Sequence, residues 1–378
     1  MRVKLVPISF FIGLVCGLVS LSWLGSVAQS PHLIDGFVRF HQLINAEAGY
    51  IPTARQVKQI VDRTRNDKAL ICVIVGGTSV FHGVGQHESM IWTRYLQEHL
   101  GPGFRVINFA QRAGRPNDVG NIAAELLLRE SRPVIYVADG TVAQFAIPYE
   151  ESFFPEILIQ AWHRGYLLPW APRDQLLSRA IWSSQPKLRN VAMGALLDNY
   201  LNFNDLWNFI GFDYANSIWN PLLGTRFLDA RSNLRDPELT PEQYRPLRYR
   251  ADLDYTIRVV RGQIMASTDP RWSMITDLAE QTIPPPLRAV TLAVIDLNSP
   301  FYRNKLSAAD RGALIEQAHE HARRLMGIGF NRAIVAAEGF SEDDYVDHVH
   351  LSVSGGQKLA AGVAPEIRDI AVKLGYLK

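Results

Sequence analysis

The sequence contains few cysteines and almost no net charge, and each shortage excludes a class of protein. Among its 378 residues only Cys16 and Cys72 are cysteines. One lies in an apolar N-terminal run and the other in a strand-like run, so neither an internal disulfide nor a cysteine-based zinc site is expected. The net charge is +2 at pH 7, and no long basic run occurs. We therefore predict no binding of nucleic acid.

One apolar run is long enough to cross a membrane, and it lies at the N-terminus. After the basic start MRVK, residues 5–25 carry no charged side chain. At about 1.5 Å per residue, a helix of this length spans the hydrocarbon core of a bilayer. Ser26 and Ala28 then provide the small residues of a signal-peptidase site. The length favours a retained anchor over residues 1–29, whereas the small residues favour cleavage after Ala28, and both interpretations stay open.

Both interpretations place residues 30–378 outside the cytoplasm, because the basic residues before the apolar run stay inside. We expect either a single-pass protein of the cell inner membrane, with its domain in the periplasm, or a protein secreted to the periplasm. In the first case the N-terminal helix has the membrane as its partner.

Strand-like and helix-like segments alternate over two parts of the chain. Residues 69–75 (ALICVIV) form an apolar run rich in β-branched residues, which suits a strand buried on both faces. Further strands are expected at 105–110, 133–139, 289–297 and 331–339, and helices at 52–65, 87–101, 118–130, 308–327 and 355–375. Thr53 and Gln56 form a capping box at the first of these helices. The alternation implies right-handed crossovers and predicts an α/β three-layer sandwich with a five-stranded parallel sheet.

The alternation stops near residue 141 and resumes after the proline-rich residues 283–286. The stretch between, about 150–285, is helical in character and holds six of the eight tryptophans, among them Trp162, Trp170, Trp182, Trp207 and Trp219. We interpret it as an insertion into the sheet domain. Its aromatic residues form a packed helical core, a wall that stacks on sugars, or a surface that rests on the membrane.

Three segments with residues suited to catalysis follow three of the expected strands. In open α/β sheets, sites form at these strand ends. Ser79 lies after the first strand, in GGTSVFHGVG (76–85). Asp347 and His350 lie after the last, in DHVHLS. A serine hydroxyl becomes a nucleophile when a histidine, oriented by a carboxylate, takes its proton. The backbone N–H groups of Ser79 and of Gly114, which follows the second strand, are the natural donors to an oxyanion.

Together these residues resemble the SGNH (GDSL-like) hydrolase superfamily. Its first block, Gly-Asp-Ser with glycines four and six residues after the serine, appears here as Gly-Thr-Ser with Gly83 and Gly85. Its second block centres on a glycine, here Gly114, and its last block, Asp-x-x-His-Leu-Ser, is present in DHVHLS. The resemblance covers about residues 69–140 and 288–375 and implies a flavodoxin-like fold.

The resemblance also implies a function. Ser79 would attack an ester carbonyl, His350 would act as general base and Asp347 would orient it, as in a serine esterase or O-acyltransferase. Membrane-anchored relatives act in exopolysaccharide acetylation and in D-alanylation of cell-wall polymers. The expected substrate is therefore an acyl ester, such as an acetyl ester, of a cell-envelope glycan, or a small ester. A polytopic membrane acyltransferase is the partner that this implies.

One block departs from the superfamily pattern. An asparagine normally follows the third strand and donates to the oxyanion, but this chain has VADGTVAQF there, with Asp139 in the region. A carboxylate would repel an oxyanion, so the Gly140 N–H or a side chain such as that of Asn117 or Gln144 would have to donate. If none does, the alternative is a non-catalytic protein of the same fold that binds glycan or serves assembly.

Two other features carry a weaker signal. His82, three residues after Ser79, either contacts substrate or packs in the core, and packing is the favoured interpretation. The segment SEDDYVDHVH offers carboxylates and imidazoles to a divalent ion, but a solvated acidic loop accounts for Asp343 and Asp344 better. We expect no metal and no other cofactor.

Overall fold

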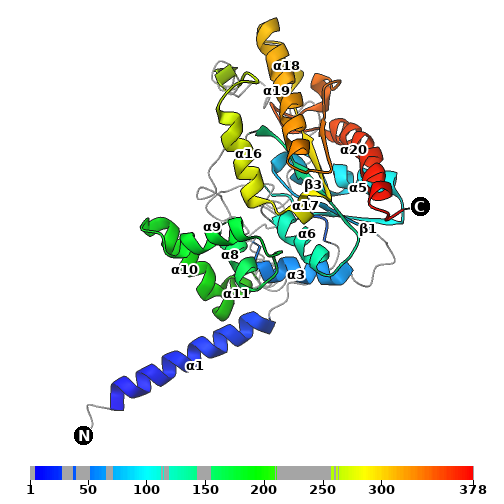
Figure 1. Ribbon diagram of the computed structural model, residues 1–378. Coiled ribbons are helices and arrows are strands. Elements are labelled where there is room, and N and C mark those ends of the chain that lie inside the picture. Colours follow the sequence, from blue (N-terminus) through cyan, green and yellow to red (C-terminus); the bar gives the residue numbers. More distant parts are fainter. Residues whose placement is uncertain are drawn as a thin grey trace, which may run out of the picture.

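The computed structural model describes residues 5–27, 37–39, 52–64, 71–111, 114, 119–142, 155–208, 210, 257–258, 261–262 and 264–377. Its centre is a sheet of five parallel strands in the order β2-β1-β3-β4-β5 (Figure 1). The strands are β1 (Ile71–Val75), β2 (Phe104–Asn108), β3 (Val134–Asp139), β4 (Thr291–Ile295) and β5 (Arg332–Val335). The predicted α/β architecture is confirmed. Each strand overlaps its predicted range, but β2 begins one residue earlier and β5 ends four residues before its predicted end.

Helices cover both faces of the sheet, as the alternation predicted. On one face lie α5 (Trp92–Leu100) and α20 (Val353–Lys373). On the other lie α3 (Ala54–Arg63), α6 (Val119–Arg129) and α19 (Ala308–Gly327). The sheet is therefore the middle of three layers.

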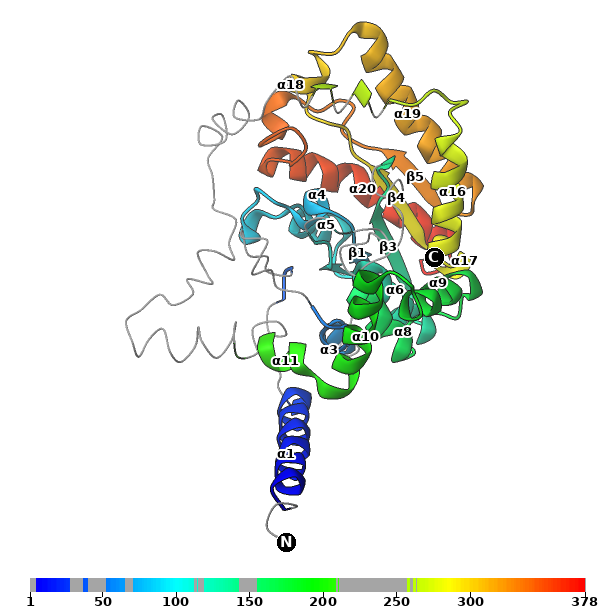
Figure 2. The ribbon, with the colours of Figure 1, turned by 90° about the vertical axis from the view of Figure 1, so that its left-hand side faces the viewer.

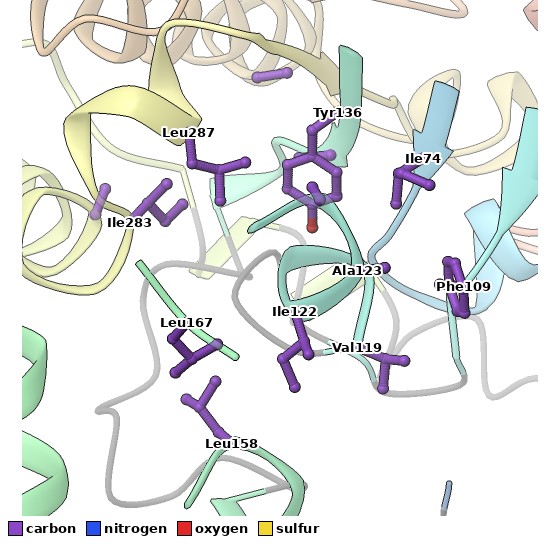
Figure 3. Close-up of a cluster of buried hydrophobic side chains, with 14 of the residues drawn as sticks. Ile74, Phe109, Val119, Ile122, Ala123, Tyr136, Leu158, Leu167, Ile283 and Leu287 are labelled. Atoms are coloured by element: carbon purple, nitrogen blue, oxygen red, sulfur yellow. The ribbon is translucent and has the colours of Figure 1, made fainter. Parts of the chain in front are cut away.

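The central strands are buried on both faces. β1, β3 and β4 contain only buried residues, as continuous apolar runs in a parallel sheet should. Alternate side chains enter two separate cores: Ile74 and Tyr136 lie on the α6 side, and Val73 and Val137 lie on the α20 side. Figure 3 shows part of the first core, in which Ile74 and Tyr136 from the strands lie near Ile122 from α6.

Local sequence determines where two of the helices begin. At α3 the Gln56 N–H donates to Thr53 Oγ1 while the Thr53 N–H donates to Gln56 Oε1, so the predicted capping box is confirmed. At α20 the Gly355 N–H donates to the hydroxyl of Ser352. This cap starts the helix at Val353, two residues before the predicted start.

The insertion between β3 and β4 is helical, as predicted. Its described helices are α8 (Pro155–His163), α9 (Ala171–Ile181), α10 (Pro186–Leu201), α11 (Phe203–Asn208) and α16 (Arg271–Thr282), and α17 (Pro285–Arg288) leads into β4. Its tryptophans differ in role. Trp162 packs against the core and Trp170 donates to a carbonyl of α16, whereas Trp182 and Trp207 are exposed. Trp219 lies outside the described residues.

The N-terminal apolar run forms one continuous helix, α1 (Leu5–Val27). Residues Ile8–Val27 are long and apolar enough to cross a membrane. The helix projects from the body, and its C-terminal end lies next to α11 (Figure 2). This is consistent with a signal sequence or with a single anchor.

A buried ion pair joins the insertion to the sheet domain. Arg173 of α9 and Glu125 of α6 have fully buried side chains, with Nη1 and Oε1 2.5 Å apart. A second contact, Nη2 to Oε2, measures 3.1 Å. The same carboxylate accepts from the Asn121 side chain and from the Leu168 N–H. These bonds satisfy a charge that would be costly to bury alone.

We predict that Arg173→Met lowers the free energy of unfolding by about 3–5 kcal/mol, because it leaves Glu125 buried without its counter-charge. Urea denaturation followed by circular dichroism measures the loss. The double variant Glu125→Gln/Arg173→Met removes both charges and should recover part of the stability. A double variant as unstable as the single one would contradict this account.

Candidate active site

Ser79 lies on a tight turn between β1 and α4 (Ser79–His82), as the sequence predicted. Gly77 makes the turn with φ of 112°, and a Cβ there would lie 2.5 Å from the Cβ of Asp139. Only glycine combines this dihedral with so close an approach. The helix ends after one turn at Gly83, whose φ is 81°. Ser79 is the first residue of α4, where a backbone N–H has no acceptor within the helix.

His350 and Asp347 complete a hydrogen-bonded line with Ser79. His350 Nε2 lies 2.8 Å from Ser79 Oγ, and His350 Nδ1 lies 2.6 Å from Asp347 Oδ2. The three side chains are partly buried, with 17% of His350 and 27% of Asp347 exposed. The sequence analysis grouped these residues, and the structure brings them together although Ser79 and His350 are 271 positions apart. The arrangement is that of a nucleophile, a base and an orienting acid.

The Asp347 carboxylate is held in its ionised form. Burial raises its pKa, but the bonds from the His350 ring and from the backbone N–H groups of His350 and Val349 outweigh burial and lower the pKa to about 2. The carboxylate therefore stays charged at any physiological pH, and it fixes the ring orientation of His350.

The neighbouring His348 has a different environment. Its Nδ1 lies 3.9 Å from Asp347 Oδ1, too far for a hydrogen bond. Burial and the nearby His350 lower its pKa. Its carbonyl accepts from the Ser299 N–H at 2.9 Å, which ties the segment to the chain that leaves β4. Of the two histidines in the motif, His350 is thus the one that reaches the serine.

Gln86 connects the serine turn to the histidine segment. Its side chain is fully buried. Nε2 donates to the carbonyls of Leu351 and Ser352, and Oε1 accepts from the Trp92 N–H. The sequence analysis missed this residue; the signal was a single amide side chain within a glycine-rich turn. Gln86 thus bonds the segment that follows the serine turn to the residues directly after His350.

Arg39 holds the same turn from the other side. It is buried, with 3% exposed. Nη1 donates to the carbonyls of His82 and Gly83, and Nη2 donates to that of Gln86. The carbonyls of His82 and Gly83 lie at the C-terminal end of α4, where a cation is favourable. The sequence analysis gave Arg39 no role.

Two of the backbone amides predicted to form the oxyanion hole, those of Gly114 and Gly140, donate to backbone carbonyls. The Gly114 N–H donates to the Gln111 carbonyl at 2.9 Å, and the Gly140 N–H donates to the Val294 carbonyl at 2.8 Å within the sheet. Either amide would have to leave its carbonyl to bind an oxyanion. Gly114 does adjoin the serine turn, since a Cβ there would lie 2.3 Å from the Gly77 carbonyl oxygen. Asn117 and Gln144 lie outside the described residues.

Asp139 occupies the place where a donor was sought, and its oxygens are already bound. Thr78 Oγ1 donates to Oδ2 at 2.5 Å, and the N–H and Oγ1 of Thr141 donate to Oδ1 at 3.0 and 2.8 Å. Burial raises the pKa of Asp139, and these bonds oppose the rise. Burial and the repulsion by Asp139 raise the pKa of the nearby Asp296 to about 8. Burial thus favours the protonated form at both carboxyl groups, and the two titrate as a pair.

His82 and the acidic segment take structural positions. His82 is 2% exposed and belongs to the inner face of α4, in line with the packing interpretation. Asp344 binds Lys358 Nζ at 2.6 Å and caps its own turn through Ser341. Within the described part of the chain, no three His, Cys, Asp or Glu side chains are grouped as metal ligands would be.

Neither a protein-family model nor a curated protein matches this chain. The function must therefore be argued from the geometry and chemistry of the site.

We predict that Gln86→Met slows covalent labelling of Ser79 by a fluorophosphonate at least about tenfold, because the histidine segment loses its bonds to the turn. It should also lower the free energy of unfolding by about 1–3 kcal/mol, since buried carbonyls lose their donor. Ile275→Val, in the distant α16 core, is the control of comparable stability cost. Equal labelling rates in the two variants would show that Gln86 has no positioning role.

We predict that Asp296→Asn flattens the dependence of stability on pH. The folded pKa of Asp296, about 8, lies above the ordinary value of 3.8, so the folded protein binds the extra proton between these values. Stability from this group is present at low pH and is lost as pH rises through about 8. Urea denaturation at several pH values measures it, with surface Asp369→Asn as control. A variant as pH-sensitive as wild type would refute the assignment.

Proposed function

We propose that the protein is an extracytoplasmic serine esterase or O-acyltransferase of the SGNH (GDSL-like) type. The observation that carries the proposal is the bonded line from Ser79 through His350 to Asp347. In this order an ionised aspartate orients the histidine, and the histidine can accept the serine proton. A serine that only caps a helix, or a loop histidine without such partners, would not be activated in this way.

The geometry supports a two-step acyl transfer. Ser79 Oγ attacks the ester carbonyl and gives its proton to His350 Nε2, while Asp347 stabilises the charged ring. The tetrahedral intermediate collapses when His350 returns the proton to the leaving alkoxide, which leaves an acyl group on Ser79. Water or a sugar hydroxyl then attacks the acyl group and passes its proton to His350. His350 returns this proton to Ser79 Oγ as the acyl product leaves.

The oxyanion must be stabilised by donors near Ser79. The Ser79 N–H at the start of α4 is the first candidate, because the helix leaves it unpaired. Thr78, which stands at the superfamily's first-block aspartate, donates to Asp139. That bond occupies one oxygen of the Asp139 carboxyl group, and bonds from Thr141 occupy the other.

The substrate that we propose is an acyl group, such as acetyl, on a cell-envelope glycan. Its support is the resemblance to membrane-anchored SGNH proteins together with the N-terminal helix α1. In the same proposal α1 anchors the domain in the inner membrane with the site in the periplasm, and a polytopic acyltransferase is the partner that supplies or receives acyl groups.

A second candidate is a non-catalytic glycan-binding or assembly protein of the same fold. Two observations favour it. Asp139 stands where the superfamily has an asparagine donor, and the amides of Gly114 and Gly140 are bound to carbonyls. An oxyanion hole with a single donor gives weaker catalysis.

We predict that the full-length protein in detergent reacts with a fluorophosphonate probe and that Ser79→Ala and His350→Ala abolish labelling. Asp347→Asn should slow it by about 10⁴-fold, because the ring loses its orientation and its counter-charge. Gel fluorescence measures the labelling, with Ser273→Ala on the α16 surface as the control serine. Folded wild-type protein that does not label would favour the non-catalytic candidate, and glycan binding would then be measured.

A further inference from the structure

Large apolar side chains are exposed along the insertion next to α1. On α10 they recur at the helical spacing of one face, and they continue on α11 and just beyond it. They are Met193, Leu197, Tyr200, Phe203, Trp207 and Ile210, each between 37% and 69% exposed. We call these six residues the apolar platform. Clustered exposure of this kind marks an interaction surface rather than ordinary scatter.

The end of α1 is docked beside the platform. Ser22 Oγ donates to the Tyr200 carbonyl at 2.7 Å, and Asn202 Nδ2 donates to the Ser22 carbonyl at 3.3 Å. Gly25 approaches so closely that a Cβ would lie 2.3 Å from the Asn202 carbonyl oxygen. Figure 2 shows α11 directly at the end of α1, with α10 alongside. The platform and the membrane-spanning candidate therefore share one boundary.

Arg55 ties this end of α1 to the body. Its Nη1 donates to the Gly25 carbonyl at 2.8 Å, and its Nη2 donates to the Ser26 carbonyl. The same guanidinium lies 3.8 Å from Asp205 of α11, which also accepts from Thr53 Oγ1 at 2.7 Å. A cation on the last carbonyls of a helix is favourable. These contacts hold α1, α3 and α11 in one fixed arrangement.

The length of α1 determines where the apolar platform lies relative to the hydrocarbon core of the bilayer. From Leu5 to Ser22 the helix rises about 26 Å, at about 1.5 Å per residue, which nearly fills a hydrocarbon core of about 30 Å. Tyr200 and Asn202, which bond to Ser22, then lie at the boundary between hydrocarbon and headgroups. Trp23 on α1 is 62% exposed at the same level.

The composition of the platform suits that boundary. Tryptophan and tyrosine concentrate where one side of a ring meets lipid and the other meets water, and the platform carries Trp207 and Tyr200. Arg189 is exposed one turn before Met193 on the same face of α10. Its guanidinium can reach anionic headgroups while its stem covers apolar surface.

We propose that the apolar platform lies in the membrane interface beside α1, so that the bilayer holds the body at two places and α1 is retained as an anchor. The proposal rests on the anchoring role proposed for α1, but not on the chemistry of Ser79. Cleavage after Ala28 would remove the helix to which Tyr200, Asn202 and Arg55 bond.

Spin labels on the full-length protein in vesicles of phosphatidylethanolamine and phosphatidylglycerol test the proposal. Single cysteines replace Leu197 and Trp207 in a Cys16→Ser/Cys72→Ala background. Glu316→Cys on the α19 surface is the matched control in water, and Leu14→Cys is the control within α1. Collisions with oxygen, which enters lipid, are compared with collisions with a nickel chelate, which does not.

We expect the ratio of oxygen to nickel collisions at positions 197 and 207 to exceed that at Glu316→Cys at least about fivefold, since the labels partition into lipid. Ratios equal to the control would overturn the proposal and leave the surface in water. Labels that neither reagent reaches would overturn it in favour of a protein partner. A water-like label at Leu14→Cys would refute the anchor itself, whereas fluorophosphonate labelling reports separately on Ser79.

A second measurement avoids the cysteine background. Wild-type protein and Trp207→Phe, reconstituted with lipids brominated near the headgroup end of the acyl chains, are compared by tryptophan fluorescence. We expect the brominated lipids to quench the fluorescence of Trp207. The difference in emission between wild type and Trp207→Phe should therefore be smaller in brominated lipids than in unbrominated ones. If that emission is unquenched, Trp207 lies away from the bilayer and the proposal fails.

Discussion

Close contact of the Gly76 backbone with the Tyr136 side chain of β3 and with Gly120 of α6 is the constraint on which the site depends. A Cβ at Gly76 would lie 2.5 Å from the hydroxyl of Tyr136, and a Cβ at Gly120 would lie 2.5 Å from the Cα of Gly76. The start of α6 and the end of β1 therefore touch without side chains between them. This contact lets the chain turn sharply after β1, and the turn exposes Ser79 at the edge of the sheet where its partners arrive.

The partners of Ser79 come from the opposite end of the chain, and neutral hydrogen bonds hold them there. Gln86 binds the carbonyls of Leu351 and Ser352 from the serine side, and the Tyr345 hydroxyl donates to the Leu297 carbonyl from the β4 side. Buried bonds of this kind position a nucleophile and its base without adding a charge to the site. The carboxylate of Asp347 is ionised, and its charge orients His350.

The insertion places the contacts with α1 on a different surface from the candidate active site. The sheet edge carries Ser79, His350 and Asp347, while α10 and α11 contact the end of α1. The buried pair of Arg173 and Glu125 transmits the position of the insertion to α6 and hence to the sheet. The insertion thus links the end of α1 to the sheet domain.

The sequence alone determined the parallel sheet, since runs such as ICVIV have one stable place, buried on both faces between helices. It also identified Ser79, Asp347 and His350, because these residue types follow strand ends whose carboxyl edges must meet. Only the tertiary structure assigned roles to Gln86, Arg39 and the coupled Asp139 and Asp296. Their importance arises from contacts across tens to hundreds of residues, and neither periodicity nor spacing records which buried carbonyl or carboxylate a side chain will face.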